Sequence, residues 1–278
     1  MRSAIDVGSN SLRLLVVDES GKLFRQEVAE TRLGEGFRQG SITSGAMDRT
    51  IEVIEEWQRQ LLEQDCHELA IFATSAVRDA ANRDEFCRLV KNRTGLELDI
   101  LSGDEEAWYS FSGAVGSFNA PKDECLLIDI GGGSTEMALY QNGEILCFSV
   151  PLGAVRWKVM AKKLLSKKVS TLDTANISNF IAVGGTATTA AAICTKTAAY
   201  SRKAIHGIKL SRKQIASLEN ELEAMPLTER REVVGLPEAR ADIIVFGLAI
   251  LGMICDLMNI KEITVSDHGI LDGYLAAH

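Results

Sequence analysis

A Gly-rich polar turn between two apolar segments occurs twice in this chain, and this repeat constrains the fold more than any other feature. Residues 4–15 read AIDVGSNSLRLL, and residues 127–138 read LIDIGGGSTEMA. In an alignment without gaps, Asp6 matches Asp129. Each copy predicts a β-hairpin whose tip presents backbone N–H groups and hydroxyls. Two such hairpins, 123 residues apart, predict two related lobes that face one ligand.

The tips of both hairpins are candidate phosphate-binding loops. Small residues let the backbone approach an anion and aim several donors at it. The loops at 8–11 and 131–134 have this composition. The alternative of two ordinary tight hairpins is weakened because both copies carry an aspartate at the end of the first strand. We therefore expect the two loops to bind one polyphosphate ligand between them.

Composition excludes several classes of protein. The length of 278 residues predicts about two domains. The six cysteines are scattered without a C-x-x-C pair, and the four histidines form no H-E-x-x-H motif, which argues against a disulfide framework, a zinc site or a histidine metal centre. No apolar run reaches 18 residues, and a strand begins within four residues of the N-terminus. We therefore expect no membrane segment and no signal peptide, and a cytoplasmic location.

Positive charge is concentrated in one part of an acidic chain. The net charge is −8, yet residues 145–218 contain one acid and twelve bases. The bases are Arg156, Lys158, Lys162, Lys163, Lys167, Lys168, Lys196, Arg202, Lys203, Lys209, Arg212 and Lys213. This sector indicates either an anionic partner or solvated helix faces. Nucleic acid is not expected, because aromatic residues make up only 6% of the chain and do not alternate with the bases.

Strands and helices alternate in both halves of the chain. Besides the two hairpins, we expect strands at 22–32, 69–73, 96–101, 145–150, 180–183 and 262–265. Helices are expected at 47–64, 83–93, from 103, 153–167, 187–193, 211–225 and 237–258. Their expected N-caps are Asn82, Ser102 and Ser211. Residues 202–213 read as a loop.

This pattern predicts an α/β fold with a mixed sheet in each of two lobes. The segment 116–123 contains Pro121 and is the expected linker. The predicted domains are residues 1–120 and 121–267, with the terminal helix 268–278 able to join the first.

Three carboxylates are candidate metal ligands. Asp6 and Asp129 end their strands, and Glu136 follows Asp129 by seven residues. Such hard oxygen ligands suit Mg²⁺, which neutralises charge during phosphoryl transfer. The alternative is that each aspartate caps its own Gly turn.

Three further features have both a structural and a functional interpretation. Gly184, Gly185 and Thr186 close a strand and open a helix, where backbone N–H groups can face an anion. Glu106 lies in the first turn of a helix, where it either favours the helix dipole or orients a water. Arg78, expected in a polar loop, is either a surface residue or a phosphate clamp.

Together these residues resemble one known family. The matching stretches are IDVGSNSLRLLV (5–16), TRLGEGF (31–37), ATSAVRDAAN (73–82), LSGDEEAWYSFSGAV (101–115), LIDIGGGSTE (127–136), PLGAVR (151–156), AVGGTATTAAAI (182–193) and VSDHGILDGYL (265–275). They are similar to the exopolyphosphatase/guanosine-pentaphosphate phosphatase (Ppx/GppA) family. The resemblance implies a two-lobed actin-like (ASKHA, ribonuclease-H-like) fold with its active site in the interlobe cleft.

The resemblance also implies roles for these residues. Glu106 would be the general base, and Asp129 and Glu136 would be catalytic residues that position Mg²⁺ and the attacking water. The implied substrate-binding residues are Ser9, Asn10, Ser11, Arg78, Gly131, Gly132, Gly133, Ser134, Gly184, Gly185 and Thr186. The implied reaction removes the terminal phosphoryl group of inorganic polyphosphate, with guanosine pentaphosphate or tetraphosphate as the other ligand class. A homodimer is left open.

The chain departs from the family pattern at its C-terminal end. Many relatives carry a long helical extension that helps to hold long polymer. The terminal motif often reads SDxGLREG, whereas Ile270, Leu271 and Asp272 stand here for its Leu, Arg and Glu. Two other functions stay open: a kinase of the actin fold, and a sensor of polyphosphate or guanosine nucleotides without catalysis.

Overall fold

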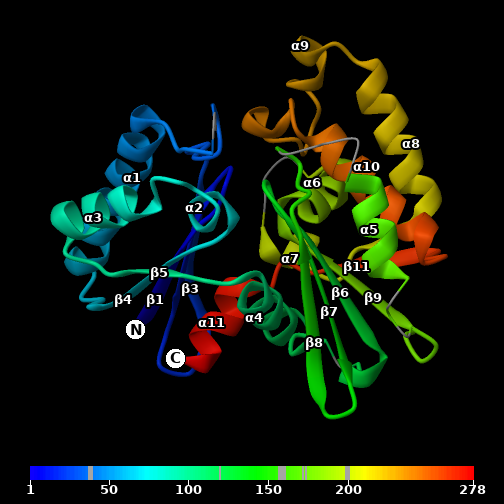
Figure 1. Ribbon diagram of the computed structural model, residues 1–278, viewed down its shortest axis with the longest axis horizontal. Coiled ribbons are helices and arrows are strands. Elements are labelled where there is room, and N and C mark those ends of the chain that lie inside the picture. The colour runs from blue at the N-terminus through cyan, green and yellow to red at the C-terminus, as the bar shows by residue number, and fades with distance from the viewer. Residues whose placement is uncertain (37–39, 119, 156–160, 171, 173, 198–200) are drawn as a thin grey trace.

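Figure 1 shows the computed structural model of the chain as two lobes with a pair of helices between them. The structure describes residues 1–36, 40–118, 120–155, 161–170, 172, 174–197 and 201–278. Each lobe is built on one mixed β-sheet. No helix among these residues has the length and apolar character needed to cross a membrane.

The first sheet has five strands. In spatial order they are β3 (Leu23–Ala29), β2 (Leu12–Val17), β1 (Arg2–Val7), β4 (Glu68–Ala73) and β5 (Leu98–Ile100). The first three strands pair antiparallel, and β4 and β5 continue the sheet in parallel with β1. The predicted first hairpin is therefore the antiparallel half of this sheet.

The second sheet has the same arrangement with one strand added. In spatial order its strands are β8 (Glu144–Val150), β7 (Thr135–Gln141), β6 (Cys125–Ile130), β9 (Asn179–Val183), β11 (Glu262–Val265) and β10 (Lys209–Ser211). The first three strands are again antiparallel, and β9 and β11 are parallel with β6. The repeat in the sequence is thus a repeat of half-sheets, and β10 is an extra edge strand.

Helices cover one face of each sheet. In the first lobe they are α1 (Ser44–Glu63), α2 (Ser75–Arg78) and α3 (Arg83–Thr94). In the second lobe they are α5 (Ala161–Val169), α6 (Gly184–Cys194), α7 (Arg202–Ile205), α8 (Arg212–Ala224) and α10 (Ile244–Leu257), while the one-turn α9 (Leu227–Arg230) has no buried residue and lies away from the sheet (Figure 1). Apolar strand residues such as Ile5 and Leu126 pack with apolar helix residues such as Ile51 and Leu251 in the two cores.

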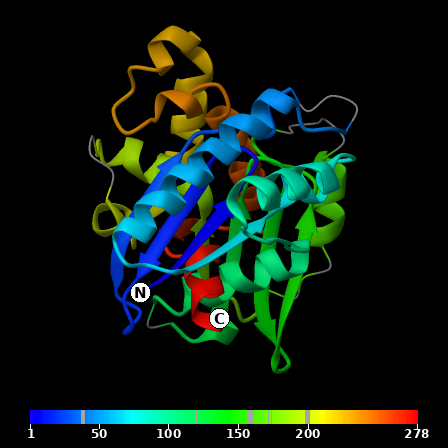
Figure 2. The same ribbon diagram turned by 90° about the vertical axis from the view of Figure 1, so that its left-hand side faces the viewer.

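The remaining two helices lie between the lobes (Figures 1 and 2). Helix α4 (Gly103–Val115) packs against the second sheet, and α11 (Ile270–Ala277) packs against the first sheet. Their backbones touch, because a Cβ atom on Gly113 would lie 2.1 Å from the Gly269 carbonyl oxygen. Since α4 lies on the second sheet although it precedes residue 120, the predicted domain boundary stays a prediction.

The structure corrects several predicted helix boundaries. Helix α1 begins at Ser44, because the Thr43 side chain caps it. The predicted helix at 237–258 is shorter: a 3-10 turn at Glu238–Arg240 precedes α10. The predicted loop at 202–213 contains α7 and β10. The predicted helix at 153–167 lies partly on residues outside those described, and α5 begins at Ala161.

Two of the three predicted N-caps are confirmed. Ser102 and Ser211 each accept a backbone hydrogen bond in a complete capping box. Asn82 does not cap α3 with its side chain. Its amide instead forms two 2.9 Å hydrogen bonds with the backbone of Ile42, which ties down the segment before α1.

Candidate active site

The two Gly-rich turns lie against each other where the lobes meet. A Cβ atom on Gly132 would lie 2.9 Å from the Ser9 Cβ, and one on Gly133 would lie 2.5 Å from the Ser75 Oγ. The Ser9 and Ser75 hydroxyls are themselves 3.1 Å apart and hydrogen-bonded. Glycine is required in the second loop because any side chain there would keep the first lobe away.

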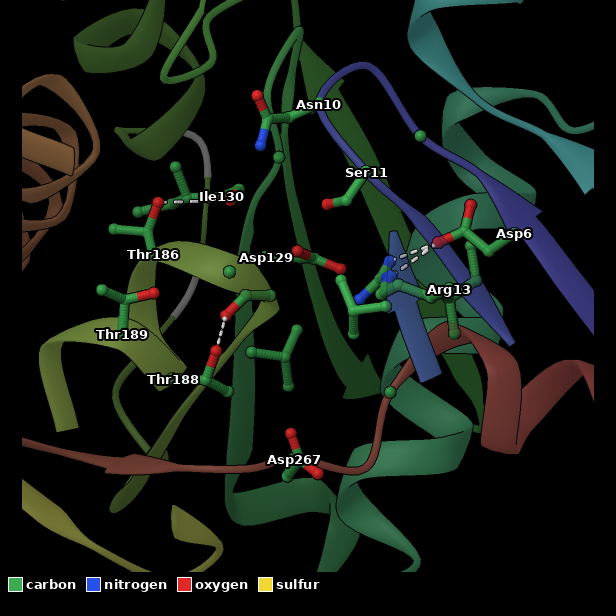
Figure 3. A pocket seen from close by; sticks show the side chains of 18 of the residues that line it. Asp6, Asn10, Ser11, Arg13, Asp129, Ile130, Thr186, Thr188, Thr189 and Asp267 are labelled. Carbon is green, nitrogen blue, oxygen red and sulfur yellow. Dashed lines mark hydrogen bonds and ion pairs between the residues drawn. The ribbon is translucent and has the colours of Figure 1, made fainter. Parts of the chain in front are cut away.

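A cavity of about 670 Å³ opens beside these turns, between the lobes. The predicted site residues that line it are Asp6, Ser9, Asn10, Ser11, Glu106, Asp129, Gly131, Gly132, Gly184, Gly185 and Thr186. The predicted site residues that do not line it are Arg78, Gly133, Ser134 and Glu136. Figure 3 shows Asn10 and Ser11 at one end of the cavity, Asp129 in the middle and Asp267 at the other end.

In the first lobe, the hairpin register places Asp6 directly opposite Arg13. The Arg13 Nε donates a 2.9 Å hydrogen bond to Asp6 Oδ2, and the side chains form an ion pair. Burial alone would lower the pKa of Arg13, but Asp6 and then Asp129 raise it above its ordinary value. The first hairpin thus holds a permanently charged guanidinium at the cavity (Figure 3).

In the second lobe, the same register places Asp129 opposite Glu136. Burial raises the pKa of Asp129, and burial together with the nearby Asp129 raises the pKa of Glu136 to about 7. Each carboxylate accepts one serine hydroxyl: Ser110 Oγ donates to Asp129 Oδ2 at 2.9 Å, and Ser149 Oγ donates to Glu136 Oε1 at 2.6 Å. Burial thus favours the protonated form of both acids, and the raised pKa lets Glu136 change protonation near neutral pH.

Glu106 is brought to the cavity by the first turn of α4. Of the three acids in this turn, Glu105 completes the capping box with Ser102, and Glu106 is the one that lines the cavity. Burial, and next the charge of Glu136, raise the pKa of Glu106 well above its usual value, while Arg78 opposes this shift. A buried carboxylate with a raised pKa has the property required of a general base near neutral pH.

The structure does not place Arg78 as predicted. It lies at the end of the one-turn helix α2 rather than in a loop, because the Val77 and Arg78 amides donate to the Thr74 carbonyl. Its guanidinium donates 2.9 Å hydrogen bonds to Glu106 Oε2 and to the Leu101 carbonyl. Arg78 therefore orients Glu106 from behind the cavity wall.

The turn at Gly184 joins the cavity to the start of α6. Gly184 has a φ of +80°, and a Cβ there would lie 2.5 Å from Asp129 Oδ1. Glycine thus allows this left-handed turn and lets Asp129 sit against the helix. At the next residue, Gly185, a Cβ would fall within 1.7 Å of the Arg240 guanidinium, which lies over the helix N-terminus.

Three site residues were missed by the sequence analysis. Arg13 matches Glu136 in the repeat alignment, so its position opposite Asp6 could have been read from the hairpin register. Arg240 donates to Ser11 Oγ at 2.9 Å and to Glu30 Oε1 at 3.2 Å. No local pattern marks Arg240 or Glu30, because they meet only through the packing of the two lobes.

The magnesium site expected from Asp6, Asp129 and Glu136 stays a prediction. Among the described residues, no three Asp, Glu, His or Cys side chains converge as metal ligands. The reason is that Asp6 is paired with Arg13 in the other lobe. However, Glu136 Oε2 is buried without a hydrogen-bond partner among these residues. The donor set therefore fits a Mg²⁺ ion held by one or two carboxylates together with phosphate oxygens of a substrate.

The basic sector only partly reaches the cavity. Arg202 lines it, but its guanidinium is paired with Asp272 at 2.8 Å and Asp267 at 3.3 Å. Arg156 and Lys158 lie outside the described residues. The described lysines of α5 do not line the cavity.

Comparison with known proteins identifies the family. The model of the Ppx/GppA phosphatase family matches residues 16–277. The chain belongs to the Ppx/GppA phosphatase family. It is therefore a phosphatase of the class that hydrolyses phosphoanhydride bonds. The predicted resemblance is confirmed.

Two curated relatives match along nearly the whole chain. A bifunctional 3-dehydroquinate synthase/phosphatase from Fusobacterium nucleatum is 30% identical over 98% of this chain, which spans 46% of that relative. Exopolyphosphatase 2 from Mycobacterium tuberculosis is 28% identical over 98% of this chain and 96% of its own length. The phosphatase family thus occurs both alone and joined to another enzyme.

Solved structures confirm the two-lobed actin-like α/β fold. The PPX-GPPA enzyme of Aquifex aeolicus has a TM-score of 0.81 with 26% identity, covering 99% of this chain and 98% of that one. An exopolyphosphatase from Cytophaga hutchinsonii has a TM-score of 0.87 with 24% identity, covering 99% and 96%. The second likeness concerns the fold alone.

Proposed function

We propose that this Ppx/GppA phosphatase removes the terminal phosphoryl group of inorganic polyphosphate, using water activated by Glu106. The observation that supports this most is the position of Glu106. It is a buried carboxylate on the wall of a cavity beside two phosphate-loop turns, and Arg78 holds it at 2.9 Å. A base held in this way is positioned to act on a water next to a bound terminal phosphate.

The polar groups of the two loops would bind the phosphates. Backbone N–H groups and the hydroxyls of Ser9 and Ser11 come from the first turn, and the amide of Gly132 comes from the second, since the Gly131 amide donates to the Ser134 carbonyl at 3.0 Å. Arg13 adds positive charge close to Asp129. Together these groups would stabilise the equatorial oxygens of the terminal phosphate during in-line attack.

The proposed reaction is hydrolysis of the terminal phosphoanhydride bond. A water oxygen forms a bond to the terminal phosphorus as the bond from that phosphorus to the bridging oxygen breaks. Glu106 takes the proton of the water, inorganic phosphate is released, and the shortened polyphosphate leaves with the bridging oxygen. Magnesium, held by Asp129 and Glu136 together with phosphate oxygens, would neutralise negative charge on the transferred group.

Guanosine pentaphosphate is the second candidate substrate. Beyond the phosphate loops, the cavity is lined by the exposed apolar side chains of Leu23 and Val28 and by the amide of Gln26 on β3. Apolar surface beside a polar group suits a nucleoside better than a chain of phosphates.

Phosphate release from long polyphosphate and from guanosine pentaphosphate, measured side by side with and without Mg²⁺, tests the proposal. We expect release from polyphosphate that needs Mg²⁺ and that Glu106→Gln lowers by about 10³-fold. Release only from the nucleotide would support the second candidate. Near-normal turnover by folded Glu106→Gln protein would remove Glu106 from its role as base.

A further inference from the structure

Two short segments face each other across the cleft and pair by charge. Glu30 follows β3 in the first lobe, and Arg240 ends the 3-10 turn before α10 in the second; Arg240 Nε donates to Glu30 Oε1 at 3.2 Å. Two residues further along each segment, Arg32 pairs with Asp242. The two ion pairs have opposite polarity, so each lobe contributes one acid and one base.

The position of Arg240 favours an anion close to its guanidinium. Its guanidinium lies over Gly185, at the N-terminal end of α6, where the helix dipole is positive. It also donates to the Ser11 hydroxyl in the first phosphate loop at 2.9 Å. An arginine over a helix N-terminus is unfavourable unless an anion lies close to both.

In the structure the anion that meets these donors is Glu30. Its Oε1 accepts from Arg240, and its Oε2 accepts from the Asn10 amide at 2.6 Å. Glu30 and Arg240 have exposed fractions of 21% and 15%, so water screens this contact only in part. Glu30, Asn10, Ser11 and Arg240 all line the same cavity. The Glu30 carboxylate therefore accepts hydrogen bonds from Asn10 in the first phosphate loop and from Arg240, which contacts that loop.

We propose that Glu30 is an internal competitor of the substrate: its carboxylate takes the place of a phosphate group at Asn10 and Arg240, and a bound polyanion must displace it. This inference rests on the proposed function only in taking the cavity as a phosphate site. It makes Glu30 a determinant of affinity. The second ion pair, Arg32–Asp242, links the same two segments but contacts no residue of the phosphate loops through its acid.

Removal of the charge on Glu30 should strengthen the binding of a phosphate ligand. In Glu30→Gln protein, Asn10 and Arg240 keep a neutral neighbour, and the repulsion between Glu30 and an incoming phosphate is removed. We expect pyrophosphate to bind about 3- to 10-fold more tightly to this variant, the size appropriate to one partly exposed like charge. The gain should shrink as salt rises, because salt screens the repulsion.

The test is calorimetric titration of the full chain with pyrophosphate, at low and high salt, for the native protein, Glu30→Gln and Asp242→Asn. Asp242→Asn is the matched control, since it breaks the neighbouring ion pair between the lobes and leaves Glu30 intact. The expected result is tighter binding to Glu30→Gln and unchanged binding to Asp242→Asn. Thermal unfolding of each variant shows that it is folded.

Two results would overturn the inference. Weaker or equal binding to Glu30→Gln would mean that Glu30 serves to hold Arg240 for the ligand. Equal tightening in both variants would mean that lobe opening, rather than displacement, controls affinity. Pyrophosphate binding can be measured without hydrolysis of polyphosphate. If the variants rank in affinity as expected but the native protein releases no phosphate from polyphosphate, this inference stands and the proposed function is overturned.

Discussion

The two hairpins have the same backbone geometry and opposite electrostatics. Seven residues separate Asp6 from Arg13 and Asp129 from Glu136, and in both lobes the two members of the pair are cross-strand neighbours. In the first lobe the pair is an acid and a base, joined by a 2.9 Å hydrogen bond. In the second lobe it is two buried acids.

The difference in charge indicates different roles for the two hairpins. In the first lobe the Arg13 guanidinium holds the acid in place, whereas in the second lobe the two buried acids side by side have raised pKa values, that of Glu136 reaching about 7. Perturbed carboxylates in a cavity are typical of functional sites. The comparison therefore predicts that the second hairpin carries the reaction and that the first hairpin holds the phosphate and the fold.

The largest expected effect comes from replacing the matched aspartates one at a time. Asp129→Asn should lower kcat by about 10³-fold, because a carboxylate beside the reacting phosphate is lost. Asp6→Asn should lower it by about 10-fold or less, since Arg13 remains at the cavity. Steady-state phosphate release from polyphosphate measures both. Equal losses would erase the division of roles between the hairpins.

The next effect is on stability, and it should be confined to the first hairpin. Arg13→Met leaves Asp6 buried and without its cation, which should lower the free energy of unfolding by about 3 kcal/mol. The matched control is Arg59→Met, whose partners Glu56 and Glu63 are exposed, so that solvent screens the pairs and little stability should be lost. Urea unfolding measures both variants. Similar small losses would show that the Asp6–Arg13 pair does not support the fold.

The hairpins also show which parts of the molecule could be predicted from the sequence. The repeat predicted two related lobes, each begun by an antiparallel hairpin and facing one ligand, because hairpins follow from local hydrophobic alternation and turns. Asp129, near the end of its strand, was expected at the cavity from its place in the repeat, whereas Glu106, in the first turn of a helix, was assigned there only by the family resemblance. Local signals of this kind are strong because the backbone fixes them.

The parts that could not be predicted depend on contacts across the lobes. Arg240 lies 229 residues from Ser11, the hydroxyl it contacts, and no pattern in either segment indicates the partner. Arg78 was predicted at the phosphate, but its pairing with Glu106 depends on how α2 and α4 pack. The packing of α4 on the second sheet is likewise a tertiary contact that no local pattern indicates.

A pH effect on stability should be specific to the second hairpin. The pKa of Glu136 is raised from 4.5 to about 7 in the folded protein, so its stabilising contribution is full below about pH 4.5 and is lost as pH rises through 7. Glu136→Gln removes that loss and should raise the free energy of unfolding by about 2 kcal/mol at pH 8 and by little at pH 5.

Urea unfolding of both proteins at the two pH values measures this difference. The exposed Glu144, on β8 of the same sheet, provides the control variant Glu144→Gln, which should change neither value. A gain that is equal at pH 5 and pH 8 would show that the buried charge of Glu136 is not what destabilises the fold.

The smallest expected effect concerns the hydrogen bond from Ser149 to Glu136. The Ser149 hydroxyl favours the ionised form of Glu136, so Ser149→Ala should raise the pKa of that carboxyl further, because one hydrogen bond to its ionised form is lost. If turnover needs ionised Glu136, the acid limb of the kcat profile should move upward, lowering kcat about 2-fold at pH 6.5 and leaving it unchanged at pH 8.5. Ser178→Ala is the matched control, because Ser178 donates a similar hydrogen bond to Glu124 at the exposed surface. A profile that falls equally at every pH would assign Ser149 to packing, and the buried acid pair of the second hairpin would then not set the pH dependence that distinguishes it from the acid–base pair of the first.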